Sequence, residues 1–319
     1  MTDTTTAAAN GAVRPSTKRR PGDTIFLGLS TGAAVSIMVI LAGVAIFLIL
    51  KGLPAITANW SEGELAGYQN NDWASFWDYV GPLLWGSIWA ALIAMVLGTP
   101  VAIGIALFIS HYAPRRLAGA LGYVVDLLAI RHFLLPYANL LNQYFGWIPI
   151  FADPVSSTGS TLFAGGVVLA VMILPIVTSI TREIFLQTPR LHEEAALALG
   201  ATRWEMIRLS VIPYARSGMV SATLLGLGRA LGETMAIALI VSPSLIFSLR
   251  ILTDGYNSQT IAANIALNFP IATDLQRSAL IGTGLMLFVV SLAVNMLARY
   301  IIAATGPGAK GRRKKGKRS

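Results

Sequence analysis

The chain has 319 residues, of which 55% are hydrophobic and only 12% are charged, and its mean hydropathy is +0.65. The charged fraction is about half that of a soluble domain, which excludes a disordered protein and disfavours a soluble enzyme. The absence of cysteine excludes disulfides, thiolate metal sites and a cysteine nucleophile. Three scattered histidines do not make a zinc site, so we expect no metal, no cofactor and no catalytic residue.

The formal net charge of +9 is concentrated at the C-terminus. Seven positive charges fall in the last ten residues, and the rest of the chain is nearly balanced. A like-charge block of this kind is typical of a tail that lies against anionic membrane lipid. Nothing else in the chain supports a nucleic-acid partner, so none is expected. The residues are Lys310, Arg312, Arg313, Lys314, Lys315, Lys317 and Arg318.

Long apolar stretches predict an all-α integral membrane protein, because about 20 such residues cross a bilayer as a helix. Five stretches satisfy this length, and a sixth, weaker stretch contains Asp126, Arg131 and His132. We expect no role for His132 beyond a place on a surface or interface. The predicted spans are Thr24–Leu50, Val80–Ile109, the weaker Leu117–Leu141, Leu162–Ile180, Met219–Val241 and Ala279–Ala303.

The placement of charge predicts the topology. Basic residues gather in the N-terminal tail, after the second span, between residues 181 and 218, and at the C-terminus, whereas the loop 51–79 is acidic. Basic segments favour the cytoplasm, and these share one side only if the weaker stretch also crosses. We therefore predict six spans with both termini cytoplasmic. The predicted divisions are a basic tail, expected to be disordered, at 1–23, a transmembrane domain at 24–303 and a second basic tail at 304–319.

The loop 51–79 is also rich in aromatic residues. Tryptophan and tyrosine commonly lie at the headgroup level of a membrane, and this interfacial role is favoured over a ligand-binding cluster. The aromatic residues are Trp60, Trp73, Phe76, Trp77 and Tyr79.

The loop 186–213 carries the signals of two short helices joined by a tight turn. It holds a cap and a proline for the first helix, a glycine suited to a left-handed turn, and a capping box for the second. In chain order these are Thr188 (N-cap), Pro189 (first helical position), Gly200 (turn), Thr202 with Glu205 (capping box) and Pro213 (end of the second helix).

Three interpretations of this loop differ in function. A helix-turn-helix can read DNA, but a reader held between two membrane spans could not reach a major groove. The loop is otherwise a docking site for a cytoplasmic partner, or a pair of helices that packs only on its own bundle.

A family resemblance favours docking. The loop is similar to the EAA loop of ABC importer permeases, in which this segment is the coupling helix that sits in a groove of the ATPase subunit. The resemblance departs at Ser210, where a branched apolar residue is usual. The matching residues are Glu194, Ala195, Ala196, Gly200, Ile212 and Pro213.

The resemblance implies a role for particular side chains in the loop. Glu194 is expected to orient the turn by bonding backbone or a partner side chain, and Gly200 to keep the turn tight. Arg203 is expected to reach acidic residues of the ATPase. A short rigid helix would transmit closure of the ATPase as a rigid-body displacement.

Two ionisable residues lie inside a predicted span. Arg229 and Glu233 are four residues apart, so they are expected to share one helix face. Ionisable groups within a membrane are costly and are candidates for function, although a structural Arg–Glu pair is the alternative. Glu233 is expected to hold Arg229 neutralised when no anion passes.

The residues around this pair suggest a subfamily. The run from Gly226 to Ala236, GLGRALGETMA, resembles the PstC-type permease of the phosphate importer. The resemblance implies a MetI-like six-span bundle in a bacterial inner membrane, with Arg229 and Glu233 on a phosphate pathway. Implied partners are a PstA-type permease, PstB-type ATPase subunits and a PstS-type phosphate-binding protein outside the membrane. A guanidinium suits phosphate through paired hydrogen bonds.

The third span departs from this pattern. The family continues an apolar helix through an Ala-Ile-Pro-Ser break, whereas this chain has Leu-Ala-Ile and then Arg-His-Phe at residues 128–133. The third span is therefore expected to be shortened and atypical.

Taken together, these features predict a non-enzymatic subunit that forms half of a phosphate pathway, with ATP hydrolysed by partner subunits. The chain has no Walker A pattern, since the glycines before Lys310 have the wrong spacing. The alternative is a secondary active anion transporter without an ATPase partner, which would more often show inverted repeats.

Overall fold

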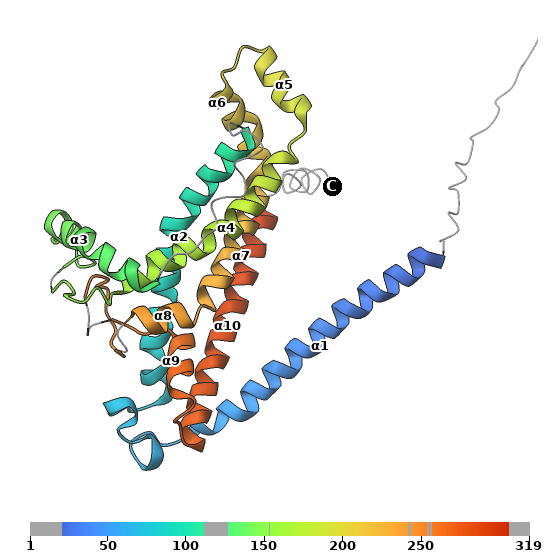
Figure 1. Cartoon of the computed structure of the whole chain (residues 1–319). Coiled ribbons are helices and arrows are strands. Elements are labelled where there is room, and N and C mark those ends of the chain that lie inside the picture. Colours follow the sequence, from blue (N-terminus) through green and yellow to red (C-terminus); the bar gives the residue numbers. More distant parts are fainter. Residues whose placement is uncertain are drawn as a thin grey trace, which may run out of the picture. The chain divides into compact units, whose positions relative to one another are not determined.

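The computed structural model describes residues 21–111 and 127–305, apart from residues 153, 242, 243, 254 and 256. Every regular element in these residues is helical (Figure 1). The chain divides into two compact units, Met1–Phe47 and Leu48–Ser319. The elements are α1 (Pro21–Thr57), η1 (Gly63–Leu65), η2 (Tyr68–Asn70), α2 (Phe76–His111), α3 (Leu127–Phe145), α4 (Leu162–Leu186), α5 (Arg190–Ala198), α6 (Arg203–Met206), η3 (Ile207–Val211), α7 (Ile212–Leu231), α8 (Met235–Ile240), α9 (Ile261–Asn268) and α10 (Asp274–Thr305).

Four of the described helices are long and apolar enough to cross a membrane. They contain the predicted first, second, fourth and last spans, which are confirmed as helices. The four stretches are Ile25–Thr57, Phe76–His111, Leu162–Leu186 and Asp274–Tyr300.

The predicted span Met219–Val241 is wrong as a single helix. Helix α7 starts earlier, at Ile212, and ends at Leu231, and a separate short helix, α8, follows. Gly232 caps the end of α7, and Thr234 stands at the N-cap of α8. The apolar composition predicts that this segment lies within the membrane, but it does not show that the helix is interrupted at Gly232.

The weaker span Leu117–Leu141 is described only from residue 127 onward, where α3 runs from Leu127 to Phe145. Helix α3 is not among the four long apolar helices of the described residues. The tails 1–20 and 306–319, which hold most of both predicted basic tails, also lie outside the described residues.

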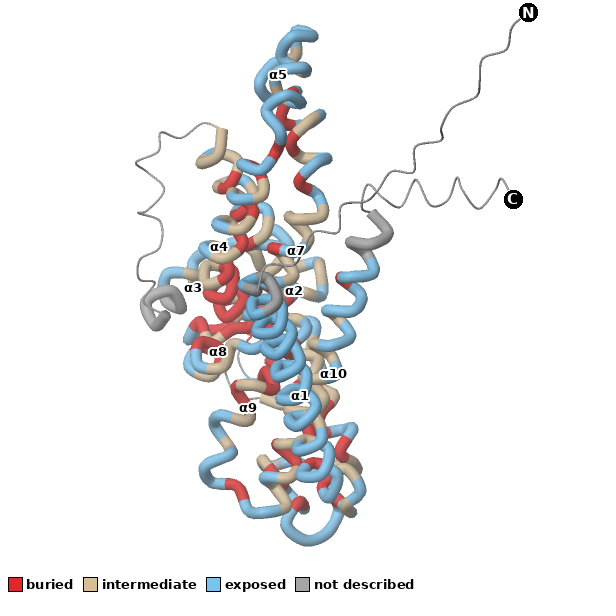
Figure 2. The backbone as a smooth tube through the Cα atoms, turned by 90° about the vertical axis from the view of Figure 1, so that its right-hand side faces the viewer, coloured by how far each residue is buried: buried red, intermediate tan, exposed pale blue. Residues whose placement is uncertain are grey.

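Helices α2, α4 and α7 pack side by side and form the main core of the second unit (Figures 1 and 2). Small residues allow this close approach. Gly98 of α2 faces α4, and a Cβ added at Gly98 would lie 3.1 Å from the Ala170 carbonyl oxygen. Gly226 of α7 meets Val177 of α4, and a Cβ at this glycine would lie only 2.7 Å from a valine methyl group. Close packing of small residues is the usual means by which membrane helices associate.

The aromatic residues of the loop 51–79 form a buried cluster at one end of this bundle, so the interfacial prediction is wrong for most of them. Trp60, Phe76 and Tyr79 are at most 1% exposed, and only Trp77 remains largely exposed, at 59%. The Trp60 and Tyr79 rings lie 5.3 Å apart, and the Tyr79 hydroxyl accepts hydrogen bonds from Asn264 of α9 and from Gln69. Composition alone could not separate a headgroup anchor from a packed cluster, because both use the same residue types.

The segment between α8 and α9 packs directly on α2 at Gly86. Backbone carbonyls of Ser258 and Gln259 approach this glycine so closely that a Cβ would lie 2.5 Å from the first and nearer still to the second. At the next residue, the Ser87 hydroxyl donates to the Leu83 carbonyl and accepts from the Ile261 amide at 2.9 Å. These contacts fix the start of α9 against α2.

Gly86→Ala is expected to destabilise the protein, because backbone atoms must move to admit the methyl group. Overpacking of this kind costs about 1–3 kcal/mol, or roughly 5 °C in melting temperature. The measurement is thermal unfolding of the purified protein. Gly104→Ala is the matched control on the same helix, since nothing lies within 4 Å of a Cβ at that position. Equal melting temperatures for the two variants would contradict the close approach.

Candidate functional site

The loop 186–213 projects from one end of the bundle as two short helices, α5 and α6 (Figure 1). The predicted start of the first helix is wrong by one residue. Pro189 is the N-cap, with φ of −61° and ψ of 125°, and α5 begins at Arg190. Thr188 does not cap the helix, because its hydroxyl is buried without a hydrogen-bond partner. Proline's fixed φ suits the extended N-cap as well as the first helical position, so the sequence signal is off by one residue.

The turn after α5 confirms the prediction for Gly200, whose φ is +84°. The Gly200 amide donates to the Leu197 carbonyl at 2.9 Å, and the Ala201 amide donates to the Ala196 carbonyl at 3.2 Å. This pair of bonds is a Schellman motif, which satisfies the last carbonyls of the helix and requires a left-handed residue. These two backbone hydrogen bonds, together with the left-handed conformation of Gly200, keep the turn tight.

The capping box at the start of α6 is also confirmed. The Thr202 hydroxyl accepts from the Glu205 amide at 3.3 Å, and the Thr202 amide donates to the Glu205 carboxylate at 2.8 Å. The Thr202 hydroxyl also donates to the Glu205 carboxylate at 2.8 Å, and the two bonds donated by the Thr202 amide and hydroxyl hold the pKa of Glu205 below its usual value. A lowered pKa means that the ionised cap stabilises α6 above the ordinary carboxyl pKa, and that this stabilisation is lost as the pH falls through the lower value.

The second helix does not end at Pro213, so that prediction is wrong. A π-helical turn, η3, joins α6 directly to α7, and the proline occupies the first turn of α7. The π-turn before it, in which the Ile212 amide donates to the Ile207 carbonyl, lets the helix continue past a residue that lacks an amide donor. The loop and α7 are consequently one continuous helical path.

Helix α5 has no buried residue (Figure 2), whereas Met206, Ile207 and Val211 are buried at the base of the loop. Glu194, Ala195 and Arg203 are exposed, and Ala196 is half-buried. The Glu194 side chain makes no hydrogen bond or ion pair to any described residue, so of its two expected contacts, backbone or a partner's side chain, the first is not found in the described residues.

Apolar side chains share this surface, and the sequence interpretation missed them. Leu199 is 90% exposed, Leu191 is 75% exposed and Trp204 is 57% exposed. A polar helix flanked by such residues is a signal that could have been found from the sequence. Exposed apolar groups beside charges are typical of a protein-binding surface.

Ser210, at which the loop departs from the family pattern, has a structural role here. Its hydroxyl donates to the His192 carbonyl of α5 at 3.2 Å, which ties the first helix to the π-turn. The two residues also line a pocket of about 580 Å³ between α5 and η3.

The second group of predicted site residues lies where α7 ends. Arg229 is exposed near the end of α7, and Glu233 lies beyond the cap, between α7 and α8. The prediction that they share one helix face is wrong, because the helix stops between them. A Glu233 carboxylate oxygen accepts instead from the Ala236 amide at 3.4 Å, and no ion pair joins Arg229 to any described acid.

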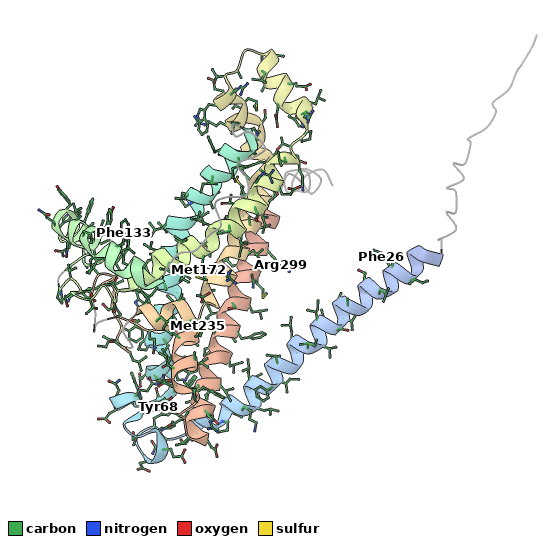
Figure 3. The ribbon with its side chains drawn as sticks, viewed as in Figure 1. Phe26, Tyr68, Phe133, Met172, Met235 and Arg299 are labelled. Atoms are coloured by element: carbon green, nitrogen blue, oxygen red, sulfur yellow. The ribbon has the colours of Figure 1, made fainter. Side chains whose placement is uncertain are left out.

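The Arg229 side chain instead lines a groove of about 560 Å³, and a second arginine lines the same groove. Arg299 of α10 lines the same groove, together with Asn295, and the two helices pack against each other (Figure 3). The sequence alone marks Arg299 only as a charge at the inner end of the last span. The spacing within one helix could not show that two helices bring two arginines to one groove.

Comparisons with known proteins assign the family. Residues 82–306 match the family described as binding-protein-dependent transport system inner membrane component. Phosphate transport system permease protein PstC 2 of Mycobacterium bovis is 40% identical over 300 residues, which cover 88% of this chain and 92% of that protein. Phosphate transport system permease protein PstC of Xylella fastidiosa is 35% identical over 304 residues, covering 88% of this chain and 90% of that protein.

Among solved structures, the chain is similar to an inward-facing form of the MetNI methionine ABC transporter. The identity is 15% and the TM-score is 0.48, over 72% of this chain and 94% of that chain. The family match spans most of the chain and includes both the loop 186–213 and the groove. The chain therefore belongs to the inner membrane components of binding-protein-dependent transport systems, among the PstC-type permeases.

Proposed function

We propose that this chain is the transmembrane subunit of an ABC importer and forms half of a pathway for inorganic phosphate, driven by partner ATPase subunits. The observation that carries the proposal is the continuous helical path from the exposed helices of the loop 186–213 to Arg229. The relatives' names, which specify phosphate transport, supply the cargo. A secondary transporter without an ATPase has no use for such a loop.

The loop is the proposed ATPase contact. Glu194 and Arg203 offer opposite charges, and Leu199 and Trp204 offer apolar surface, with the turn between them held by Gly200. Ala195 and the half-buried Ala196 keep α5 slender enough to enter a groove. This combination of apolar centre and charged rim is usual for a specific protein interface.

The charges at the two ends of the bundle support an inner-membrane orientation with cytoplasmic termini. The α5 end carries basic residues, which favour the cytoplasm, and the opposite end carries acidic ones. On this orientation a PstS-type phosphate-binding protein docks at the acidic end, and a PstA-type permease provides the other half of the pathway. The basic residues are Arg182, Arg190, Arg203, Arg208 and Arg216; the acidic ones are Glu62, Glu64, Asp72, Asp78 and Asp274.

Arg229 and Glu233 are the proposed pathway residues. Arg229 has no acidic partner among the described residues, so its guanidinium is available to an anion. Glu233 bonds the start of α8 and thereby maintains the break that ends α7 beside Arg229. Phosphate oxygens accept paired hydrogen bonds from a guanidinium, and transport requires that this binding remain weak enough for release.

Uptake of labelled phosphate by reconstituted vesicles tests the proposal. The vesicles contain this chain, a PstA-type permease and PstB-type ATPase subunits, with the binding protein added outside. We expect uptake only when ATP and the ATPase subunits are present. Uptake by this chain under an ion gradient, without any ATPase, would instead establish a secondary transporter.

A further inference from the structure

We infer that Arg299 of α10 is a second anion-binding residue of the pathway and that it binds the phosphate oxyanion in the same groove as Arg229. The inference rests on the proposed function and extends it to a residue on another helix. Its basis is the groove described above, in which two cationic side chains from two helices line one space of about 560 Å³.

The groove is formed by matching stripes of residues. The lining residues of α7 repeat every three or four positions from Ser221 to Arg229, and those of α10 do so from Asn295 to Arg299. Figure 3 labels Arg299 on α10. Gly228 leaves space beside the first arginine, since nothing lies within 4 Å of a Cβ there. The lining residues are Ile176, Ser221, Leu224, Leu225, Gly228 and Arg229, with Asn295, Ala298 and Arg299 from α10.

The charges in this groove are not compensated. Within the described residues the only ion pair joins Arg277 to Asp274, which lies near the start of α10, far along the helix from Arg299. Two guanidiniums that line one groove repel each other, and each is costly in a membrane without a counter-charge. An anion that carries up to two negative charges and several acceptor oxygens reduces both costs. The Asn295 amide adds a further donor.

Two sources can supply such a phosphate group: free inorganic phosphate and a lipid headgroup. Arg299 lies about 9 Å from the end of α10, at about 1.5 Å per residue, so a headgroup is within its reach. A phosphodiester carries a single negative charge and needs one arginine, whereas inorganic phosphate can neutralise both. Arg229 lies about 25 Å along α7 from Ile212, at about 1.5 Å per residue. Because Arg229 lines the same groove as Arg299, the groove favours the free anion.

Arg299→Gln is expected to lower phosphate uptake by roughly 10- to 100-fold, because it removes charge-assisted hydrogen bonds to the cargo. Arg299→Lys should restore part of the rate, since it keeps the charge but loses the paired geometry. Arg277→Gln is the matched control on the same helix and should transport normally. Equal uptake by the Arg299→Gln variant and the unaltered complex overturns the inference.

A labelling experiment separates a direct anion site from a structural role. The chain has no cysteine, so Leu225→Cys places a single thiol in the groove. In the assembled complex in maltoside, the anionic sulfonatoethyl methanethiosulfonate should modify it faster than the cationic trimethylammonioethyl reagent. Inorganic phosphate should slow the anionic reaction, and Arg299→Gln should weaken both effects, because Arg229 alone then remains in the groove. The extent of labelling is measured from the mass of this chain alone.

The outcomes distinguish the inference from the proposed function. If the complex takes up phosphate but the two reagents react equally and phosphate gives no protection, the inference fails and the proposed function stands. If added anionic phospholipid protects the thiol and inorganic phosphate does not, the groove is a headgroup site and the inference fails. If the unaltered complex takes up no phosphate with ATP, the proposed function itself fails.

Discussion

Arg229→Gln is expected to abolish phosphate uptake while leaving the complex assembled. The side chain is exposed on the groove wall and makes no ion pair to a described residue, so its loss breaks no salt bridge within the described chain. It does remove paired, charge-assisted hydrogen bonds to the cargo, each worth about 1.5–3 kcal/mol. Two such bonds correspond to at least about a hundredfold loss in the rate of uptake.

The measurement is the uptake of labelled phosphate by vesicles, with co-purification of the partner subunits as the test of assembly. Arg229→Lys should retain partial uptake, because the charge remains. A variant that assembles and transports at the normal rate would show that Arg229 does not contact the cargo.

The second large effect is expected for Gly200→Val in the docking loop. A φ of +84° is strained for a branched side chain, at a cost of about 1–3 kcal/mol, so the turn will change its geometry. The Schellman bonds then fail, and α5 no longer presents its surface to the ATPase in one orientation. We expect uptake and transport-coupled ATP hydrolysis to fall by about tenfold or more.

Two variants control for this change. Gly200→Asn should retain most coupling, because asparagine tolerates the left-handed region. Gly104→Val adds the same side chain at an open helical site and should leave coupling intact. Full coupling in the Gly200→Val complex, with normal co-purification of the ATPase, would argue against the loop as the contact.

The sequence predicts a structural feature most accurately where that feature is determined by residues close together in the chain. The Gly200 turn and the Thr202–Glu205 capping box are correct because each depends on backbone groups within a few positions. The four long apolar helices are predicted for a similar reason, since length and composition alone allow them to span a bilayer.

Features that depend on contacts between distant segments are not predicted. The burial of Trp60 and Tyr79 and the groove shared by Arg229 and Arg299 both arise from packing between separate elements. In each case the residue type indicates only a local position, such as a headgroup anchor or a charge on one helix. The position seen in the structure depends on residues of another element, far along the chain.

The uninterrupted passage from α6 through η3 into α7 has a mechanical consequence. Arg229 lies about 25 Å along α7 from Ile212, at about 1.5 Å per residue. A tilt of about 10° imposed at the docking end would therefore shift the guanidinium by about 4 Å, more than a hydrogen bond's length. On the proposed function, a small displacement of the loop by the ATPase subunits would therefore be enough to break the contact between Arg229 and phosphate.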